Sequence, residues 1–353
     1  MCGNVRRTSD LRKQTQTPRL LALLLILSVL MVIPMPKVRK AVIAAAGRAT
    51  RQYPASSAVQ KAMFPLVDRD GLTKPTIQII GEEAIESGIE EICIITQPGE
   101  EPLYRDYFKR LEGDMLKSFK GKDWAILESE KLAAFGQRLY FAEQHTQDGF
   151  GHAVYQAKDF VKDEPFLLLL GDHVYISYSK DRCAKQAIKV FEEFNCEAVT
   201  AVNPIMDREL HGFGTIRGEP IDAGRGIYRA QLIIEKPSIE IAREKLVTPG
   251  FPAGNYLAHF GQHVFSPRIF DSLEQLIKNN LREKNEFQLT AAQEHLRENS
   301  SGRYFVAIIQ GQRYDTGIPY GLMETQLALA LNGIHRTEIC ESIARILAMQ
   351  IRS

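Results

Sequence analysis

The chain has 353 residues, of which 44% are hydrophobic and 25% are charged, a composition typical of a globular protein. Its formal net charge of +1 excludes recognition of nucleic acid or of an anionic membrane through a broadly basic surface, so any polyanionic ligand must be held by a few placed cations. The five cysteines are widely spaced and include no Cys-x-x-Cys pair, which favours a reducing cytoplasm over a zinc site or a disulfide framework.

The N-terminus has an unusual composition. Residues 20–33 are apolar apart from one serine, but the run is shorter than the roughly 18–20 residues that span a bilayer. Three interpretations stay open: a dispensable extension with the true start at Met35, a membrane anchor, and a cleaved signal, although no small-x-small site precedes Pro34. We expect residues 1–34 to be an extension and residues 35–353 to be a single domain, with membrane contact only if the apolar run anchors the chain.

Short apolar runs alternate with helical patterns over the first half of the chain. Apolar runs typical of buried strands lie at residues 41–46, 92–96, 139–143 and 166–170. Helical patterns lie between them at residues 77–88, 104–111 and 153–161. Strands that alternate with helices at this interval require crossover connections, which predicts a mostly parallel sheet.

The second half of the chain is more mixed. Strands are expected at residues 198–202, 215–216, 232–234 and 256–265. Helices are expected at residues 267–278, 288–298 and 319–331, and an amphipathic terminal helix at residues 338–351. The whole pattern predicts one α/β domain, with a Rossmann-like, mostly parallel sheet flanked by helices and a helix at the C-terminus.

Small and charged residues follow the predicted strands where each strand ends. They lie at residues 47–51, 144, 171–172, 235–236 and 314–317. Ligands of open parallel sheets gather at this edge, where small residues admit phosphate oxygens, Arg and Lys neutralise them, and carboxylates hold Mg²⁺. The set therefore predicts phosphoryl transfer. A P-loop and a dinucleotide site are both disfavoured, because the chain has no Gly-Lys-Ser/Thr and no GxGxxG after the first strand.

The order of these motifs resembles a known family. Residues 40–65, KAVIAAAGRATRQYPASSAVQKAMFP, are similar to the signature of the sugar nucleotidyltransferases, in particular the bacterial UTP–glucose-1-phosphate uridylyltransferases, which carry A-A-G-x-G-T-R and a later P-K-E-M-x-P. The resemblance continues in the family's order through KPTIQIIGEEAIESGIEEICIIT, GHAV, LLLLGDHV, HGFGTI, IIEKP, EFQLT and GQRYDTG. It covers residues 38–331 and leaves the N-terminal extension outside.

The resemblance implies a fold of the nucleotide-diphospho-sugar transferase type and a reaction. A phosphate oxygen of glucose 1-phosphate attacks the α-phosphorus of UTP in line, which gives UDP-glucose and pyrophosphate without a covalent intermediate or a general base. Mg²⁺ and a homo-oligomer are implied in the same way. Two alternatives stay open: the same chemistry with another pair, such as dTTP or a different hexose phosphate, and a non-catalytic sugar-nucleotide sensor.

The resemblance also assigns roles to individual residues. The residues assigned to catalysis are Arg51 at the leaving pyrophosphate, Lys61 at the reacting phosphates, Asp172, and Lys236 at the sugar phosphate. The residues assigned to the nucleotide are Ala45, Ala46 and Gly47 through their backbone, Gln144 at the uracil edge, and Gly149 against the base. The residues assigned to the sugar are Gly214, Glu235, Lys236 and Asn255, and those assigned to the metal are Asp172 and Asp315.

Several positions depart from the family pattern. They are Ala49 for Gly, Ser57 for Lys, Gln60 and Ala62 beside Lys61, His145 for Gly, His173 for the second Asp of LGDD, and Ala291 for Asp. If position 49 needs a positive φ, its alanine costs about 1 kcal/mol. We expect His145 and His173 to line the site rather than bind metal. The departures leave the assigned metal and phosphate residues in place, so they bear on specificity more than on reaction type.

Overall fold

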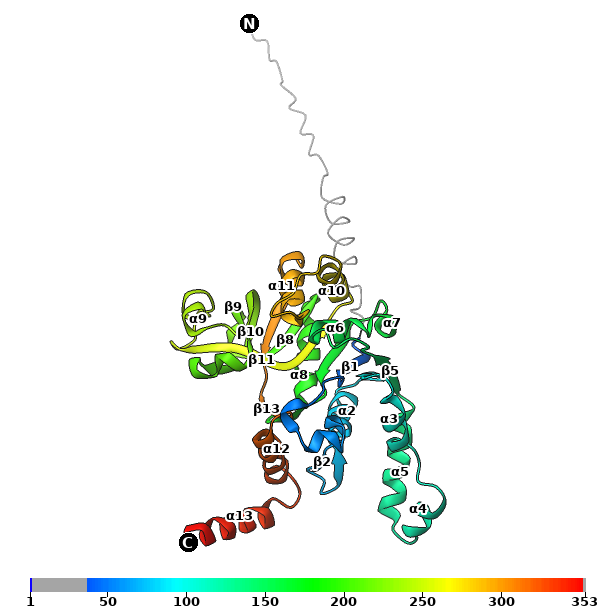
Figure 1. The fold of residues 1–353 in the computed structure, drawn as a ribbon. Helices are drawn as coiled ribbons and strands as arrows, with labels where there is room; N and C mark the ends of the chain where they lie inside the picture. The colour runs from blue at the N-terminus through cyan, green and yellow to red at the C-terminus, as the bar shows by residue number, and fades with distance from the viewer. Residues whose placement is uncertain (2–36, 352–353) are drawn as a thin grey trace. The chain divides into compact units, whose positions relative to one another are not determined.

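The computed structural model describes residues 37–351 together with Met1, and residues 37–353 make up one compact unit. Apart from Met1, the predicted extension with its apolar run at residues 20–33 lies outside the described residues. The compact unit is built on a central sheet with helices on both faces (Figure 1), which confirms the expected α/β fold class.

The first half of the chain forms the parallel part of a nine-stranded sheet. Its strands, in spatial order, are β5 (Leu139–Glu143), β4 (Glu91–Thr96), β1 (Lys40–Ala44) and β6 (Phe166–Leu170). Each pairing among them is parallel, so their carboxyl ends lie at one edge of the sheet. These are the four apolar runs predicted from the sequence. β1, β4 and β6 are almost wholly buried, as expected for strands covered on both faces.

The second half of the chain extends the sheet with mostly antiparallel strands. In spatial order they are β11 (Asn255–Phe265), β8 (Ala198–Met206), β12 (Tyr304–Ile308), β10 (Ile227–Glu235) and β9 (Gly214–Asp222). Only the pairing of β8 with β12 is parallel among these described strands. β9 also pairs with β11, so this end of the sheet curls back on itself. The register of β11 shifts between His259 and His263, at a bulge that contains Gly261 with φ of 88°.

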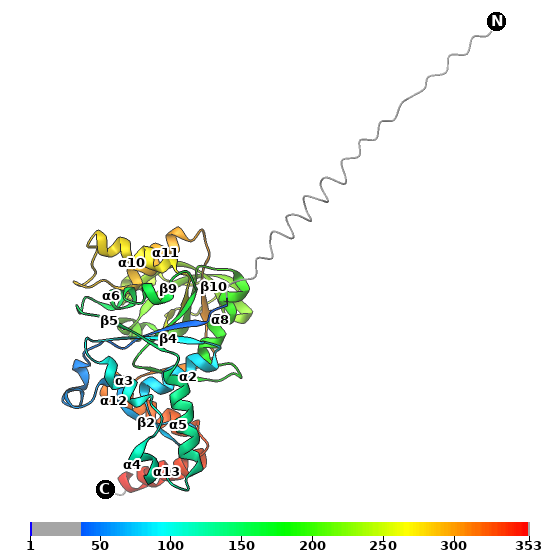
Figure 2. The ribbon, with the colours of Figure 1, turned by 90° about the vertical axis from the view of Figure 1, so that its right-hand side faces the viewer.

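Helices cover both faces of the sheet. α6 (Phe150–Tyr155), α10 (Arg268–Lys278) and α11 (Leu289–Asn299) lie on one face, and α2 (Thr76–Glu86) and α8 (Cys183–Phe194) on the other (Figures 1 and 2). The single helix predicted at residues 153–161 is instead α6 followed by α7 (Lys158–Val161). The break occurs because the N–H groups of Gln156 and Ala157 bond three residues back, to Ala153 and Val154, which tightens the turn.

An arm of three helices extends away from the sheet (Figure 1). It consists of α3 (Glu101–Tyr107), α4 (Gly113–Ser118) and α5 (Asp123–Gly136). Phe108 stacks on Phe135 with ring centroids 4.4 Å apart, which fixes the base of the arm. The sequence pattern indicated α3 but not α4 or α5.

The chain ends in α12 (Pro319–Leu331) and α13 (Arg336–Ile351). The structure confirms α12 at its predicted bounds, and α13 begins two residues before the predicted terminal helix. Ile346 and Leu347 on α13 are 60% and 58% exposed, so the apolar stripe of this helix does not belong to the core of the described unit.

A short two-stranded ribbon joins the end of β6 to the segment before α12. It consists of β7 (His173–Ser177) and β13 (Gly311–Asp315), which pair in antiparallel fashion with His173 opposite Asp315. Neither strand was predicted. The ribbon matters because it brings residue 172, at the end of β6, next to residue 315.

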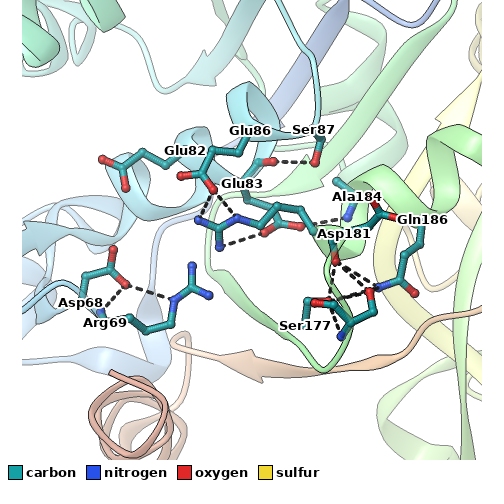
Figure 3. Close-up of polar contacts among 12 residues, drawn as sticks. Asp68, Arg69, Glu82, Glu83, Glu86, Ser87, Ser177, Asp181, Ala184 and Gln186 are labelled. Carbon is teal, nitrogen blue, oxygen red and sulfur yellow. Dashed lines mark hydrogen bonds and ion pairs between the residues drawn. The ribbon is translucent and has the colours of Figure 1, made fainter. Parts of the chain in front are cut away.

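A polar cluster ties α8 to α2 on the far face of the sheet from α6 (Figure 3). The carboxylate of Glu83 accepts a hydrogen bond of 2.8 Å from the backbone N–H of Ala184, and the Arg182 guanidinium lies 3.5 Å from Glu83 and 2.6 Å from Glu86. Nearby, the Ser177 hydroxyl donates to the Asp181 carbonyl at 2.6 Å. These contacts fix the start of α8 and the end of β7, on which the ribbon depends.

Candidate functional site

The loop after β1 opens the first of two adjoining cavities. Backbone hydrogen bonds of 2.9 Å from Ala45 to Ile95 and from Gly171 to Ala44 join the ends of three parallel strands. A Cβ on Gly171 would come within 2.7 Å of the Ala44 carbonyl oxygen, so only glycine permits this close approach.

The cavity at this edge has a volume of about 290 Å³ and collects the residues predicted for the nucleotide. Those that line it are Ala45, Ala46, Gly47, Gln144 and Gly149, together with Lys61 and Asp172. The structure therefore brings together, at the carboxyl edge of the sheet, a set of residues that the sequence placed far apart.

Ala49 adopts the backbone conformation that its glycine-like position suggested. Its φ is 51° and its ψ is 37°, in the left-handed region, immediately before the short 3₁₀ helix at Thr50–Gln52. Position 49 therefore has the positive φ that its glycine in the family pattern suggested, and its alanine carries a backbone strain of about 1 kcal/mol relative to glycine.

Gln144 and Gly149 form the wall of the first cavity where a base would lie. Gln144 is 3% exposed, and its amide donates to the Gly149 carbonyl at 3.1 Å and lies 3.2 Å from Nδ1 of His152. Gly149 has φ of 102°, and a Cβ there would lie 2.8 Å from the Phe287 carbonyl oxygen. A fixed amide beside a flat glycine surface suits the edge and face of a planar base.

Lys61, Asp172 and Asp315 converge on Gly317. The Lys61 ammonium is ion-paired with Oδ2 of Asp172. A Cβ on Gly317 would meet the Lys61 ammonium and would lie 2.7 Å from Oδ2 of Asp172 and 2.8 Å from Oδ1 of Asp315. Both the N–H and the hydroxyl of Thr316 donate to the Asp172 carbonyl, at 2.8 and 2.9 Å, which holds the end of β13 against the end of β6.

The charge states at this point follow from burial and neighbours. Burial alone would raise the pKa of Asp172, but His173, Lys61 and Arg51 together hold that pKa below its ordinary value. Burial lowers the pKa of His173 to about 4, so its imidazole is neutral near pH 7. The cluster thus presents an ionised carboxylate next to an uncharged ring.

The same residues fit a divalent cation that prefers oxygen ligands. One potential ligand atom each from Asp172, His173 and Asp315 lie within 4.8 Å of one another. Asp315 uses Oδ1 to accept from the Gly317 N–H at 2.7 Å, while its Oδ2 lies 4.0 Å from Nε2 of His173. Two carboxylates, each with one oxygen still available to a metal, are what a protein usually contributes to a magnesium site. Substrate phosphates and water complete the coordination.

A second cavity, of about 390 Å³, adjoins the first. Phe150, Leu170 and Glu286 line both cavities, and the consecutive residues Asp172 and His173 line one each. The two cavities therefore adjoin at these shared residues, beside Asp172 of the carboxylate cluster.

Most residues predicted for the sugar line the second cavity. They are Gly214, Glu235 and Lys236, and Arg51 faces the same space. Glu235 accepts a hydrogen bond of 2.6 Å from the Thr290 hydroxyl, and a Cβ on Gly214 would lie 3.0 Å from the Glu235 carboxylate. The glycine leaves that carboxylate accessible to a ligand.

Asn255 lies apart from this group. It is the first residue of β11, four residues before His259, and it is not among the described residues that line the cavity. At the rise of a strand this separation is about 13 Å.

The polar residues of the second cavity that sequence reasoning missed include His259 and Arg313. Burial lowers the pKa of His259 to about 4, and its Nε2 is buried without a hydrogen-bond partner among the described residues. Arg313 stood in the quoted motif GQRYDTG, and its place two residues before Asp315 could have indicated the same face of a strand. His259 had no such signal, because it enters the cavity through the bulge of β11.

None of the helices in the described part of the chain is both long enough and apolar enough to cross a membrane.

Comparisons with known proteins agree with this geometry. Residues 40–330 match the family model described as "Nucleotidyl transferase". UTP–glucose-1-phosphate uridylyltransferase 1 of Staphylococcus saprophyticus is 32% identical over 311 residues, which are 88% of this chain and 99% of that protein. UTP–glucose-1-phosphate uridylyltransferase of Bacillus subtilis is 35% identical over 299 residues, 84% of this chain and 92% of that protein.

Solved structures show the same likeness. A UDP-glucose pyrophosphorylase complexed with UDP-glucose superimposes with a TM-score of 0.65 at 27% identity, over 82% of this chain and 98% of that one. UDP-glucose pyrophosphorylase from Acinetobacter baumannii gives a TM-score of 0.69 at 24% identity, over 88% and 99% of the two chains, and supports the fold.

Proposed function

The chain belongs to the nucleotidyl transferase family, and we propose that it transfers the uridylyl group of UTP to glucose 1-phosphate, giving UDP-glucose and pyrophosphate. The observation that carries the proposal is the meeting of two cavities beside Asp172, an ionised carboxylate that is ion-paired with Lys61. Relatives named for this reaction, which match over more than four fifths of the chain, support the choice of substrates.

The proposed reaction is an in-line displacement at the α-phosphorus of UTP. A phosphate oxygen of glucose 1-phosphate forms the new P–O bond, and the bond to the bridging oxygen of pyrophosphate breaks. Lys61, already held at the cluster, and Arg51 offset the negative charge of the two approaching substrates. Because the attacking phosphate is ionised near neutral pH, no side chain has to remove a proton.

The proposed metal is Mg²⁺, with Asp172 and Asp315 as its protein ligands. When bound, Mg²⁺ would neutralise charge on the phosphates and fix their orientation. His173 is left to shape the site as a neutral ring, in agreement with its low pKa.

The proposed nucleotide contacts are the backbone of Ala45, Ala46 and Gly47, with Gln144 at the base edge and Gly149 beneath the base. An amide at this position can pair with uracil or thymine, so it excludes purines better than it separates UTP from dTTP. Use of dTTP in place of UTP is therefore the nearest alternative.

The proposed sugar contacts are Glu235, which would accept hydrogen bonds from hydroxyls, Lys236 at the sugar phosphate, and the backbone at Gly214. Asn255 receives no role in this proposal, because it begins β11 outside the described lining of the cavity.

A homo-oligomer and a cytoplasmic setting are part of the proposal. The apolar side chains of Ile346, Leu347 and Met349 are exposed on α13 and would be covered by a second copy. Cys93, Cys183 and Cys196 are buried free thiols, as expected in a reducing compartment.

The test is pyrophosphate release by the full chain with Mg²⁺ and glucose 1-phosphate, compared across UTP, dTTP, CTP and GTP. The proposal predicts release that requires both substrates and the metal and is fastest with UTP. Preference for a purine nucleotide would contradict the role of Gln144. Binding of UDP-glucose with no release from any pair would favour the sensor.

A further inference from the structure

The second cavity contains a guanidinium to which the proposed roles assign nothing. Arg313 lies in β13 and faces Tyr175 across the ribbon, as Asp315 faces His173. Side chains two residues apart on a strand point to the same face, so Arg313 and Asp315 share one face of the ribbon. The Arg313 guanidinium lies over the Phe213 ring at 4.4 Å from its centroid, beside Gly214.

Among the described residues, this cation has no ion-pair partner, although the carboxylates of Asp315 and Asp172 are near enough to act on it electrostatically. Arg313 is only partly exposed, and burial lowers its pKa, although a guanidinium stays charged at neutral pH. Among the residues that the structure describes, none accepts a hydrogen bond from its side chain or pairs with it within ion-pair distance. A desolvated cation whose nearest carboxylates lie beyond ion-pair distance is unfavourable, so the position points to an anionic ligand.

The location of Arg313 identifies the kind of anion. On one side lie Gly214 and Glu235, the proposed sugar contacts, and on the other lie Asp315 and His173 at the carboxylate cluster. The group that connects a sugar to the reacting centre is its phosphate. Lys236, proposed for the same phosphate, already has Glu235 at 3.4 Å, so it offsets less of a dianion than a free cation would.

We infer that Arg313 binds the phosphate of the acceptor sugar phosphate, and this inference rests on the proposed function. The planar guanidinium donates two N–H groups to two phosphate oxygens, a geometry that lysine cannot reproduce. Phe213 supports the flat side of the group and limits its orientations. Arg313 transfers no proton, and its contribution is to hold the attacking phosphate and offset its charge.

Product fragments separate this contact from its neighbours. The α-phosphate of UDP-glucose comes from UTP and the β-phosphate comes from glucose 1-phosphate, so UMP lacks the phosphate in question and UDP has it. The affinity gained from UMP to UDP reports the phosphate contact, and the gain from UDP to UDP-glucose reports the sugar contacts.

The experiment measures dissociation constants of UMP, UDP and UDP-glucose for the full chain in one Mg²⁺-containing buffer. Arg313→Gln should bind UMP as the wild type does and should lose about 10- to 100-fold of the gain from UMP to UDP, the usual worth of a charge-assisted pair. For Arg313→Lys, the gain in affinity from UMP to UDP should lie between those of the wild type and of Arg313→Gln. Arg217→Gln, which alters an exposed arginine on β9, is the control and should change none of the three constants.

Other outcomes would overturn the inference. A loss confined to the step from UDP to UDP-glucose would show that Arg313 contacts sugar hydroxyls. Equal loss for UMP, or a lower melting temperature shared by the Gln and Lys variants, would show a structural role. A wild type that binds none of the three ligands would overturn the proposed function itself, and the inference with it.

Discussion

Two single residues carry much of the local geometry of the site, and the first is Ala49. Its φ of 51° is a conformation that glycine adopts freely and alanine does not. Ala49→Gly should therefore raise the free energy of unfolding by about 1 kcal/mol. Urea denaturation measures this, with Ala58→Gly as the control, because Ala58 in the same loop has φ of −101° and should lose stability or stay unchanged. A less stable Ala49→Gly protein would contradict the strain.

The second is Gly317, which leaves room for three charged groups. A Cβ there would crowd Lys61, Asp172 and Asp315 together, as the distances of 2.7 and 2.8 Å to the two carboxylates show. Gly317→Ala should lower kcat by about 10²-fold, since small misplacements of catalytic groups cost that much. Gly224→Ala adds the same methyl group where the nearest atom is 3.6 Å away and should keep full activity. Equal turnover of the two variants would show that the cluster tolerates displacement.

At the scale of elements, the ribbon of β7 and β13 positions Asp315. The Thr316 hydroxyl donates to the Asp172 carbonyl at 2.9 Å and holds the ribbon to β6. Thr316→Val should cost about 1 kcal/mol of stability, the usual worth of one hydrogen bond, and should lower kcat as well. Thr325→Val removes a similarly buried hydroxyl that bonds within α12, so it should lower stability without lowering kcat. If both variants kept full turnover, the ribbon would have no positioning role.

Several elements that form a distinct apolar segment were predicted well, but others were missed, including α8 (Cys183–Phe194), whose buried residues recur at helical spacing. β5, β6 and α12 have their predicted bounds, because each is a distinct apolar segment. α5 was missed because its buried residues are only Ala125, Ser129 and Phe135, too few for a stripe along fourteen residues. β12 has an apolar run, YFVAI, that could have been predicted. β7 begins directly after the turn at residues 171–172, and its run of β-branched and aromatic residues, HVYIS, could also have been predicted.

At the scale of the whole molecule, α13 is the surface that we expect a second copy to cover. Its Ile346, Leu347 and Met349 are 60%, 58% and 64% exposed. Leu347→Glu with Ile346→Glu should shift the protein to a smaller species in size-exclusion chromatography with light scattering, because charges oppose burial of the face. Ile241→Glu, on an exposed apolar residue of α9 (Ile239–Lys245), is the control. An unchanged mass, or a monomeric wild type, would rule out this interface.

The residues of the candidate site that lie at the ends of strands could be predicted from the sequence. The sequence placed Gly47, Gln144 and Asp172 after predicted parallel strands, and such strands share one edge. The second cavity depends instead on the curl of β9 toward β11 and on the bulge at Gly261, which no local pattern encodes. His259 and Arg313 were therefore missed, and Asn255 was placed with the sugar although it lies outside the described lining.

The most direct test of the account is UDP-glucose formation by Asp172→Asn with UTP, glucose 1-phosphate and Mg²⁺. Asp181→Asn, at a surface aspartate paired with Lys189, is the matched control. The account predicts that Asp172→Asn loses at least about 10²-fold in kcat while remaining folded, because the change removes a charge at the reacting centre, and that Asp181→Asn is fully active. An Asp172→Asn enzyme with wild-type turnover would contradict the claim that transfer occurs where the two cavities meet.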